Sequence, residues 1–456
     1  MQKLSCEEIL AATGGSLVCG NLGTDFSNIS TDSRKVGFNE LFIPIVGEKF
    51  DGHDYIISSL EMGASGALTQ VDTGFYEGKV IIRVENTLKA LQDIARYYRS
   101  KFSIPVVGIT GSVGKTSTKD MVACTIATRL NVHKTEGNFN NEIGMPLTVF
   151  KLDQGHEAAV FEMGMSGFGE ISRLTSIAKP DIAIITNIGM SHIEKLGSRV
   201  NIMKAKLEIL EGLAEKGLVV LNGDDDMLSS LKGSLPFETV FYGINGIYEY
   251  QARNIDNLGE NGTRFDIELE QKVYTVYVPV PGLHNVYNAL AAIAAGKRLG
   301  IPVESMIEGI RAFSPGKMRL NIITNNGIKI IDDAYNASPQ SMEAAICVLK
   351  DISGASRKIA VLGDMLEMGD FAPEAHRRVG RFAAQKGLET VVTVGENARY
   401  IAEGAAESAE TAEVLSFEDN AEVCAFLKNY LISGDVVLVK GSRGMKMEQI
   451  VESLKS

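Results

Sequence analysis

The stretch that decides the fold is Ile104-Pro-Val-Val-Gly-Ile-Thr-Gly-Ser-Val-Gly-Lys-Thr-Ser-Thr-Lys119. An apolar run, typical of a buried strand, breaks into a glycine-rich turn and then enters a segment compatible with a helix. Gly111 and Gly114 allow a tight turn whose peptide N–H groups can face an anion. Lys115 adds a positive charge, and Thr116 offers a hydroxyl to Mg²⁺ at the positive end of the helix. The stretch therefore predicts a site for the phosphates of a nucleotide, formed by Gly111, Ser112, Val113, Gly114, Lys115, Thr116 and Ser117.

The spacing of this loop departs from the common G-x-x-x-x-G-K-[ST] pattern. Position 109, five residues before Gly114, is Ile, and the nearer glycine lies only three residues before it. A turn that only joins a strand to a helix rarely needs Gly-x-x-Gly-Lys-Thr, so the phosphate-binding interpretation is favoured over a plain structural turn.

The length and composition indicate a soluble globular protein. A chain of 456 residues is expected to form about three domains. Hydrophobic residues make up 45% and charged residues 22%, which is ordinary for a folded protein. The net charge of −12 argues against sequence-independent nucleic-acid binding, which needs clustered Lys and Arg, so we expect no nucleic-acid partner.

The cysteines and the first residues bear on the compartment. The five cysteines lack C-x-x-C spacing, which predicts neither a zinc site nor a disulfide framework. The stretch from Met1 to Glu8 has no long apolar core, and no run of about 18 apolar residues occurs. We therefore expect a cytoplasmic protein without a signal peptide or a membrane span.

Residues 1–84 are expected to form a small α/β domain. The polar cluster Ser30-Thr-Asp-Ser-Arg34 precedes the apolar run Glu40–Val46. Its Ser, Thr and Arg side chains could bind a phosphorylated ligand. A solvated loop capped by an Asp explains the cluster equally well.

Residues 85–313 are expected to form a central domain on a parallel or mixed sheet. A linking helix is predicted over 86–101, and apolar strands over 157–162, 181–186 and 217–221 alternate with helical patterns. Each strand ends in polar residues, where doubly wound sheets bind their ligands. We therefore expect the chemistry at these strand ends.

In this central region, a loop rich in asparagine and an acidic residue at the end of a strand are candidates for the functional site. Asn138, Asn140 and Asn141 belong to Thr135-Glu-Gly-Asn-Phe-Asn-Asn141, for which a surface turn is the alternative interpretation. Glu162 closes a strand, where it could coordinate a cation or be an ordinary strand-end acid.

Further candidates lie later in the same region. His192 follows Thr186-Asn-Ile-Gly189 in a strand-end loop, where a lone histidine is usually only hydrogen-bonded. Lys206 lies in a helical stretch, where a solvated lysine on the helix surface is the alternative to a functional role. Asn285 and Asn288 lie three residues apart near the start of an Ala-rich helix and so share one face. Exposed amides there could read the edge of a purine or only cap the helix.

Residues 314–456 are expected to form a Rossmann-like third domain. Helical patterns separate strands that are predicted over 328–332, 358–362, 390–394 and 436–439. The ends of these strands are polar, as in a domain that binds a ligand in a crevice. The chain is therefore predicted to be a three-domain α/β enzyme that uses a nucleoside triphosphate.

Seven motifs together resemble the Mur ligase family, and the resemblance spans the whole chain. They are Gly111-Ser-Val-Gly-Lys-Thr116, Thr135-x-Gly-Asn-x-Asn-Asn141, Glu162-Met-Gly164, Thr186-Asn-Ile-Gly-x-x-His192, Ala205-Lys-x-Glu208, Gly282-x-His-Asn-x-x-Asn288 and Asp333-x-Tyr-Asn336. Stretches 47–53, 335–339, 361–369 and 439–448 look like the members that join D-alanyl-D-alanine to UDP-N-acetylmuramoyl-tripeptide. Ser338 stands where those members usually have a second Asn.

The resemblance implies an ATP-dependent, ADP-forming ligase of peptidoglycan precursor synthesis, with two Mg²⁺ ions. Its catalytic residues would be Lys115, Glu162, His192 and Lys206, the last as a carbamate. The metal ligands would be Thr116, Glu162, His192 and this carbamate. The phosphate loop would be joined in the ATP site by Asn285, Asn288, Arg319 and Asp333.

The resemblance also distributes the other substrates over the chain, which we expect to be a monomer. The UDP-linked substrate would be bound by Ser30, Thr31, Asp32, Ser33, Arg34, Asn138, Asn140 and Asn141. D-alanyl-D-alanine would be bound by Asn336, Ser338, Lys440, Ser442 and Arg443.

Two alternatives to this function stay open. One is another ligase of the family, such as the enzyme that adds the third amino acid, or a folylpolyglutamate synthetase. The absence of an Asp-Asn-Pro-Arg stretch weighs against the former, and Asp51-Gly-His53 weighs against the latter. The other is a nucleotide-hydrolysing regulatory protein, which the phosphate loop alone would permit but the separate amine-site domain disfavours.

Overall fold

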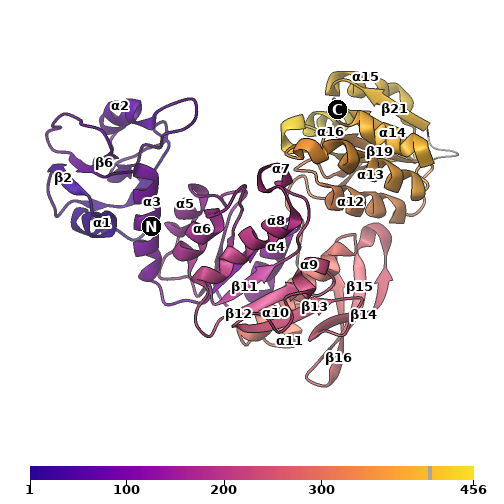
Figure 1. The fold of residues 1–456 in the computed structure, drawn as a ribbon, viewed down its shortest axis with the longest axis horizontal. Coiled ribbons are helices and arrows are strands. Elements are labelled where there is room, and N and C mark those ends of the chain that lie inside the picture. Colours follow the sequence, from indigo (N-terminus) through magenta and orange to yellow (C-terminus); the bar gives the residue numbers. More distant parts are fainter. Residues whose placement is uncertain (409–412, 456) are drawn as a thin grey trace. The chain divides into compact units, whose positions relative to one another are not determined.

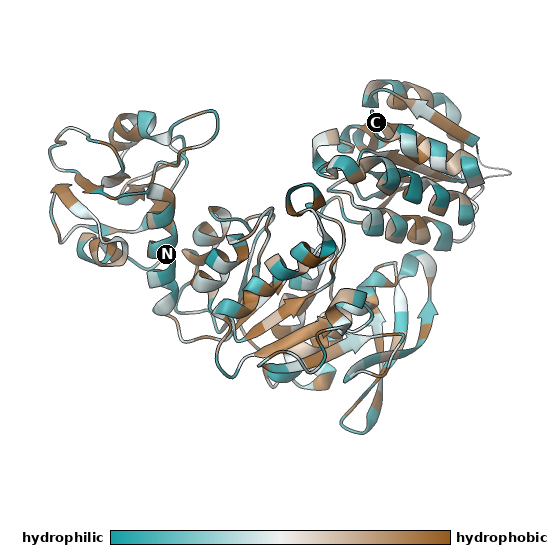
Figure 2. Ribbon diagram, viewed as in Figure 1, coloured by the Kyte–Doolittle hydropathy of each residue, from teal (hydrophilic) through white to brown (hydrophobic). Residues whose placement is uncertain are grey.

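The computed structural model describes residues 1–408 and 413–455 as an α/β fold (Figure 1). Apolar residues concentrate in the strands, and the helices carry polar residues on one side (Figure 2). This distribution is expected where helices cover a sheet whose strands are buried on both faces. In the described part of the chain, no helix is both long and apolar enough to cross a membrane.

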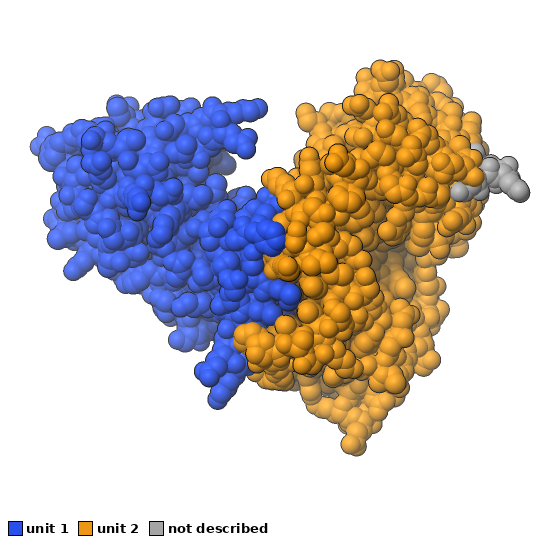
Figure 3. Space-filling view, viewed as in Figure 1, with its two compact units in different colours: residues 1–110, 130–183, 207–217 blue, residues 111–129, 184–206, 218–456 orange. Residues whose placement is uncertain are grey.

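Contacts divide the chain into two compact units (Figure 3). Unit 1 comprises Met1–Thr110, Leu130–Ala183 and Leu207–Gly217. Unit 2 comprises Gly111–Arg129, Ile184–Lys206 and Leu218–Ser456. These units do not follow the three predicted domain ranges, which stay a prediction.

The first part of unit 1 is built on a five-stranded sheet. Its strand order is β2(Ser16–Cys19)-β7(Val80–Arg83)-β6(Gly66–Thr69)-β5(Glu40–Phe42)-β4(Asn28–Ser30), and only β2 runs antiparallel to its neighbour. The short strands β1(Leu4–Ser5) and β3(Asp25–Phe26) pair antiparallel. The helical segments are α1(Cys6–Thr13), η1(Gly52–Tyr55), α2(Ile56–Glu61) and the linking helix α3(Thr87–Ser100). Asn86 caps α3 by accepting from the N–H of Lys89, so this helix begins one residue inside its predicted range.

A nine-stranded sheet carries the central part of the chain. Its order is β16(Lys272–Val278)-β15(Thr263–Leu269)-β14(Tyr250–Asn257)-β13(Glu238–Gly243)-β12(Leu218–Asn222)-β11(Ile182–Ile185)-β8(Val106–Thr110)-β10(Ala158–Glu162)-β9(Val132–Lys134). In unit 1, β8, β10 and β9 are parallel, and every residue of β8 and β10 is buried. Unit 1 also contains α5(Gly144–Val149), α6(Glu170–Ala178) and η2(Glu208–Gly212).

The portion of this sheet in unit 2 continues in parallel from β12 to β14 and then turns antiparallel over β14, β15 and β16. The sheet is therefore mixed. The helical segments are α4(Lys115–Ile126), α7(Ile193–Leu196), α8(Arg199–Leu207), α9(Asp226–Ser229), η3(Gly259–Asn261), α10(His284–Arg298) and α11(Val303–Arg311). Gly309 allows α11 to pack closely on α4, because a Cβ there would lie 2.5 Å from the carbonyl oxygen of Cys124.

The last part of unit 2 contains a six-stranded sheet. Its order is β17(Asn321–Asn325)-β18(Ile328–Asp332)-β22(Val436–Lys440)-β19(Lys358–Gly363)-β20(Thr390–Val394)-β21(Glu413–Phe417), and only β17 is antiparallel. The helical segments are α12(Pro339–Asp351), η4(Gly369–Phe371), α13(Ala372–Gln385), α14(Arg399–Ser408), α15(Asn420–Tyr430), η5(Arg443–Met445) and α16(Glu448–Lys455). The four predicted strands of this region all form, within one residue of their expected ends.

Candidate active site

The phosphate loop follows β8 and ends at the start of α4. Gly111 and Gly114 have φ of +149° and +84°, values that favour glycine, and Gly114 is the N-cap of the helix. A Cβ at Gly111 would lie 1.9 Å from Oγ1 of Thr186. This position therefore requires glycine for space as well as for backbone conformation.

Residues 186–189 hold the loop in place, a role that the sequence analysis did not assign to them. The side chain of Asn187 accepts from the N–H of Val113 and donates to its carbonyl oxygen, both at 2.9 Å. The hydroxyl of Thr186 donates to the same oxygen at 2.6 Å. The N–H of Gly189 donates to Oγ of Ser112 at 2.8 Å. The motif Thr186-Asn-Ile-Gly189 was the available signal for this clamp.

Two charged side chains fix this clamp in turn. Asp225 accepts the N–H of Ile188 at 2.8 Å and also caps α9. Arg199 donates to the carbonyl oxygen of Ile188 from Nη2, at 2.8 Å. Burial raises the pKa of the Asp225 carboxyl. Both peptide groups that flank Ile188 are therefore anchored from outside the loop.

Lys115 and Thr116 lie in the first turn of α4. Nζ of Lys115 donates to the carbonyl oxygen of Gly111 at 2.8 Å, so the ammonium lies over the loop. The hydroxyl of Thr116 accepts from Nη2 of Arg319 at 3.1 Å, and the guanidinium of Arg319 lies over the ring of Tyr335, 4.1 Å from its centroid. The structure thus brings the predicted nucleotide residues Lys115, Thr116 and Arg319 together.

Lys206 lies in α8 with only 1% of its surface exposed. Burial, reinforced by the positive charge of Lys115, lowers the pKa of its ammonium well below the usual range. The alternative interpretation as a solvated helix lysine is therefore wrong. An amine in this setting is held towards its neutral, nucleophilic form.

His192 directly precedes α7 and has a left-handed backbone, with φ of +64°. Its Nδ1 lies 2.6 Å from Oε2 of Glu367, which belongs to the loop after β19. Hydrogen bonding to His192 lowers the pKa of the Glu367 carboxyl. Glu367 was not among the predicted site residues, although it lies within the motif at 361–369.

Glu162 ends β10 in unit 1 and is 2% exposed. Its Oε1 accepts from Nδ2 of Asn140 at 2.7 Å, and its N–H donates to Oγ1 of Thr135 at 3.0 Å. Its Oε2 is buried and has no partner among the described residues. A buried carboxylate oxygen without a partner is costly, and a bound cation would satisfy it. The residue therefore fits the role of a magnesium ligand.

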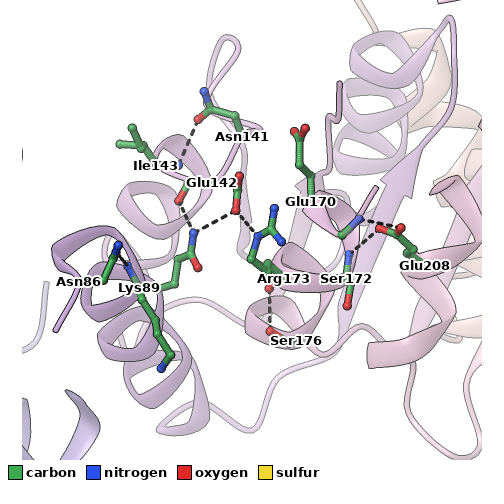
Figure 4. Close-up of polar contacts among 12 residues, drawn as sticks. Asn86, Lys89, Asn141, Glu142, Ile143, Glu170, Ser172, Arg173, Ser176 and Glu208 are labelled. Atoms are coloured by element: carbon green, nitrogen blue, oxygen red, sulfur yellow. Dashed lines mark hydrogen bonds and ion pairs between the residues drawn. The ribbon is translucent and has the colours of Figure 1, made fainter. Parts of the chain in front are cut away.

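The other residues of the amide-dense loop lie either at the surface or at the start of a helix. Asn138 is exposed. Asn141 lies just before α5 and accepts the N–H group of Gly144, the first residue of that helix, at 2.8 Å. It also accepts the N–H group of Ile143 at 3.3 Å (Figure 4). The surface-turn interpretation describes these two residues well. Glu208 of the motif Ala205-Lys-x-Glu208 is likewise a cap, because its carboxylate accepts the N–H of Ser172 at the start of α6 (Figure 4).

Asn285 and Asn288 share one face of α10, as predicted, but they are 5% and 6% exposed rather than exposed amides. Asn288 donates to Oδ1 of Asn285 at 3.0 Å and accepts from the hydroxyl of Thr118 at 2.9 Å. Asn285 donates to the carbonyl oxygen of Pro281 at 2.8 Å. The pair therefore links α10 to α4, directly behind the phosphate loop.

Lys440 and Ser442, predicted to bind the dipeptide, are both buried. Nζ of Lys440 lies 2.5 Å from Oδ2 of Asp333 and donates to the carbonyl oxygen of Asn336 at 3.0 Å. Oγ of Ser442 accepts the N–H of Leu366 at 2.8 Å. Both side chains thus shape the loops around them.

The other residues that are predicted to bind the dipeptide differ in their exposure to solvent. Ser338 is buried and forms a capping box with Ser341 at the start of α12. Asn336 is exposed, and Arg443 is more than half exposed with an ion pair to Glu448 at 3.1 Å. Asn336 and Arg443 are therefore the members of this group that solvent reaches.

The predicted UDP cluster lies after β4 in unit 1. The side chain of Arg34 is 84% exposed and donates two hydrogen bonds, of 2.8 and 3.0 Å, to the carboxylate of Asp32. These bonds lower the pKa of Asp32 to about 2. Oγ of Ser30 accepts the N–H of Asp32 at 3.2 Å, while Thr31 and Ser33 are half-buried. Arg34 can reach a phosphate only by sharing or leaving Asp32.

Three protein-family models match most of the chain. They are the Mur ligase family catalytic domain over residues 25–99, the Mur ligase middle domain over 109–296, and the Mur ligase glutamate ligase domain over 318–443. The chain is also 42% identical over 433 residues to UDP-N-acetylmuramoyl-tripeptide--D-alanyl-D-alanine ligase of Bacillus subtilis (strain 168), covering 94% of this chain and 93% of that protein. The chain belongs to the Mur ligase family.

Solved structures of other Mur ligases agree with this assignment. This Mur ligase matches a crystal structure of MurF from Acinetobacter baumannii with a TM-score of 0.93 and 30% identity, covering 100% of this chain and 99% of that one. It matches MurF of Thermotoga maritima, solved in complex with ADP, with a TM-score of 0.84 and 30% identity over 94% and 97% of the two chains. The predicted family and the α/β fold are confirmed.

Proposed function

We propose that this Mur ligase joins D-alanyl-D-alanine to UDP-N-acetylmuramoyl-tripeptide in peptidoglycan precursor synthesis, with hydrolysis of ATP to ADP and phosphate. The supporting observation is the 42% identity to the Bacillus subtilis ligase of this name, over nearly the full length of both chains. The phosphate loop and its clamp supply the nucleotide site that such a reaction needs. We expect the enzyme to act in the cytoplasm.

The chemistry explains why ATP is required. A carboxylate is a poor acyl donor, so its oxygen attacks the γ-phosphorus of ATP, and ADP leaves. The amine of D-alanyl-D-alanine then attacks the acyl carbon, phosphate leaves with the bonding electron pair, and the amine loses a proton. The ammonium of Lys115 and the N–H groups of the phosphate loop stabilise the negative charge that accumulates on the phosphates. Alignment of the amine with the acyl carbon can contribute about 7–11 kcal/mol.

The residues present fit Mg²⁺ that arrives with the nucleotide. In unit 2, Thr116 offers its hydroxyl and His192 a ring nitrogen to such an ion. In unit 1, Glu162 offers its unpartnered Oε2. The described residues hold no ready cluster of three or more His, Cys, Asp or Glu side chains, so phosphate oxygens and water would complete the coordination. When bound, Mg²⁺ would neutralise charge on the phosphates.

Lys206 would act as a carbamate in this enzyme. Its burial and the charge of Lys115 favour the neutral amine, which can add to CO₂ and lose a proton. The product is a carboxylate in place of a cation. Beside Lys115 a carbamate would form an attractive pair where two ammonium groups repel. It would also offer oxygen atoms to the second Mg²⁺.

The substrate assignments from the family resemblance remain part of the proposal. Residues 1–84 would bind the UDP moiety through the cluster at 30–34, residues 85–313 would bind ATP, and residues 314–456 would bind the dipeptide. The exposed side chains of Asn336 and Arg443 support direct contact with the dipeptide, whereas the buried Lys440 and Ser442 would shape its site.

Substrate-dependent release of ADP tests the proposal. We expect ADP release to require both UDP-N-acetylmuramoyl-tripeptide and D-alanyl-D-alanine, with one amide product formed per ADP, as measured by mass spectrometry. Omission of either substrate should leave only background hydrolysis. ADP release at full rate without the dipeptide would identify a nucleotide hydrolase instead. Release with glutamate or a diamino acid in place of the dipeptide would identify another member of the family.

A further inference from the structure

The turn between β14 and β15 contacts two elements of the region built on the six-stranded sheet, and all of these elements belong to unit 2 (Figure 1). Nδ2 of Asn257 donates to Oδ2 of Asp351, the last residue of α12, at 2.7 Å. Glu260 forms an ion pair with Lys329, the second residue of β18. The turn at 257–262, the contact turn, therefore touches both β18 and α12.

The contact turn is stabilised by its own bonds and by close packing. Oδ1 of Asn257 accepts the N–H of Gly259 at 3.0 Å. Gly259 and Gly262 have φ of +60° and +102°, values that favour glycine. A Cβ at Gly262 would lie 2.1 Å from the carbonyl oxygen of Val278 in β16, and a Cβ at Gly259 would lie 3.0 Å from that of Asp351. The turn is therefore fixed to its own sheet and lets the end of α12 approach its backbone.

The two elements that the contact turn holds are consecutive in the chain. β18 leads into the loop at 333–338, and α12 follows this loop directly. The loop contains Asn336, which we assign to the dipeptide. Lys329 lies near the start of β18, and Asp351 ends α12. The contact turn therefore holds the end of this β–α unit that is opposite to the loop.

The loop end of the unit lies at the phosphate-loop clamp. A Cβ at Gly189 would lie 3.0 Å from Oε1 of Gln340, in the first turn of α12. Further along the helix, a Cβ at Gly282 would lie 2.9 Å from Cγ2 of Val348. Positions 340, 348 and 351 share one face of a helix with 3.6 residues per turn. One face of α12 is therefore held along its whole length, from the clamp to the contact turn.

We propose that the contact turn positions the loop at 333–338 for the amide-forming step, and that Glu260 and Lys329 are positioning residues for this step. α12 is about 20 Å long, so a shift of its far end displaces the loop at its near end. The amine must meet the acyl carbon beside the phosphate loop, and such alignment is sensitive to small displacements. The inference rests on the proposed function, because it concerns the step that uses the dipeptide.

A surface ion pair without influence on the reaction is the competing explanation. The side chains of Lys329 and Glu260 are 30% and 32% exposed, and exposed pairs commonly contribute little to stability. Reversal of one charge distinguishes the two explanations. It replaces attraction by repulsion at the contact turn and leaves every residue assigned to the substrates unchanged.

The variants are Lys329→Glu, Glu260→Lys and the double variant that exchanges the two charges. Arg264→Glu is the matched control, because it makes the same change in an ion pair, with Asp256, that lies within the hairpin of β14 and β15. Steady-state kinetics of the full chain measure the KM values for D-alanyl-D-alanine and for UDP-N-acetylmuramoyl-tripeptide. Hydrogen exchange of the peptide groups in the contact turn measures its docking without any substrate.

We expect each single reversal to raise the KM for the dipeptide by about fivefold or more and to speed hydrogen exchange in the contact turn. The KM for the UDP-linked substrate, which residues 1–84 are proposed to bind, should change less, whereas a general loss of structure would affect both. The double variant should recover both properties, and the control should match the wild type.

A wild-type KM for the dipeptide in both single reversals, or a double variant no better than either, would overturn the inference. Faster hydrogen exchange without a change in this KM would also overturn it, since docking would then have no role in positioning. If a reversal prevents folding, Asn257→Asp decides the question by placing like charges at Asp351, and Asp351→Asn added to it should restore the KM. The proposed function fails separately, because it requires ligation by the wild type.

Discussion

Arg319 donates from Nη2 to the hydroxyl of Thr116 over 3.1 Å, although the two residues lie 203 positions apart. Its guanidinium also lies over the ring of Tyr335, so one planar group joins the first turn of α4 to the loop after β18. A lysine could supply the charge but not the planar fork with several donors. We therefore expect the predicted nucleotide site to depend on the shape of this side chain.

We predict that Arg319→Lys raises the KM for ATP by about tenfold, and that Arg319→Ala raises it further, because both lose the planar donor at Thr116. Steady-state kinetics with varied ATP measure the effect. Tyr335→Leu removes only the stacking partner and should cause a smaller change. Wild-type KM values in Arg319→Lys would show that charge alone suffices.

Asn187 makes two hydrogen bonds to the peptide groups of Val113. Asn187→Ala should therefore lower stability by about 1–3 kcal/mol and weaken ATP binding, because the phosphate loop loses its clamp. Thermal unfolding and calorimetric titration with an ATP analogue measure the two effects. Asn131→Ala, which removes an amide bound to the carbonyl oxygen of Gly155, is the control and should leave ATP binding intact. Equal affinity in both variants would contradict the clamp.

Lys115→Ala should reduce ligation by about 10²-fold or more while leaving the fold intact. The side chain lies over the phosphate loop and contacts a carbonyl oxygen there, so its loss opens no cavity in the core. Circular dichroism checks the fold, and ADP release checks the activity. Turnover above a few per cent of the wild type would remove Lys115 from the catalytic set.

Lys206→Ala should be inactive and partly rescued by small carboxylic acids, which can occupy the place of the carbamate. Lys206→Arg should stay inactive, because a guanidinium cannot add to CO₂. Incubation of the wild type with ¹³C-bicarbonate should give a carbamate signal in NMR spectra that Lys206→Arg lacks. Full activity in either unsupplemented variant would exclude a role for the carbamate.

The buried side chain of His376 should make the free energy of unfolding depend on pH. It is fully buried, its Nε2 accepts the N–H of Met365 at 2.9 Å, and burial lowers its pKa below 6.5. A depressed histidine pKa gives stability that is complete above the unfolded value, near 6.5, and is lost as pH falls towards the folded value. Each unit by which the pH falls within this window lowers the free energy of unfolding by up to about 1.4 kcal/mol.

Thermal unfolding at pH 7.5 and 5.5 measures this effect. His376→Gln keeps an acceptor for Met365 but cannot gain a proton, so its stability should change less between these two pH values. Most paired carboxylates titrate below this window, so they should not mask the difference. An unchanged pH dependence in the variant would show that His376 does not titrate on unfolding.

Much of the fold could be predicted from apolar runs, because strands that are buried on both faces show them plainly. The antiparallel end of the central sheet was harder. Thr263–Leu269 alternates buried and solvent-facing residues, as a strand with one solvated face does, but no strand was predicted over these residues within the parallel or mixed sheet. The strand-end positions of Glu162 and Lys440 followed from the same apolar runs.

The environments of single side chains could not be predicted in this way. Lys206 lies in a helix of ordinary polarity, and only its neighbours in space make it buried. Asn288 looked exposed because its partner, Thr118, is 170 positions away. Glu367 gave no separate signal, because its partner His192 is equally remote in sequence. Burial and pairing depend on contacts that sequence spacing does not encode.

Gly111 has a consequence for inhibition. A larger residue there would collide with Thr186. An anion bound by the backbone N–H groups of such a loop is held by groups that no substitution removes. An inhibitor held by these N–H groups would therefore leave the enzyme few routes to resistance. A substitution that displaced the compound would also displace the clamp on which the cell's own nucleotide depends.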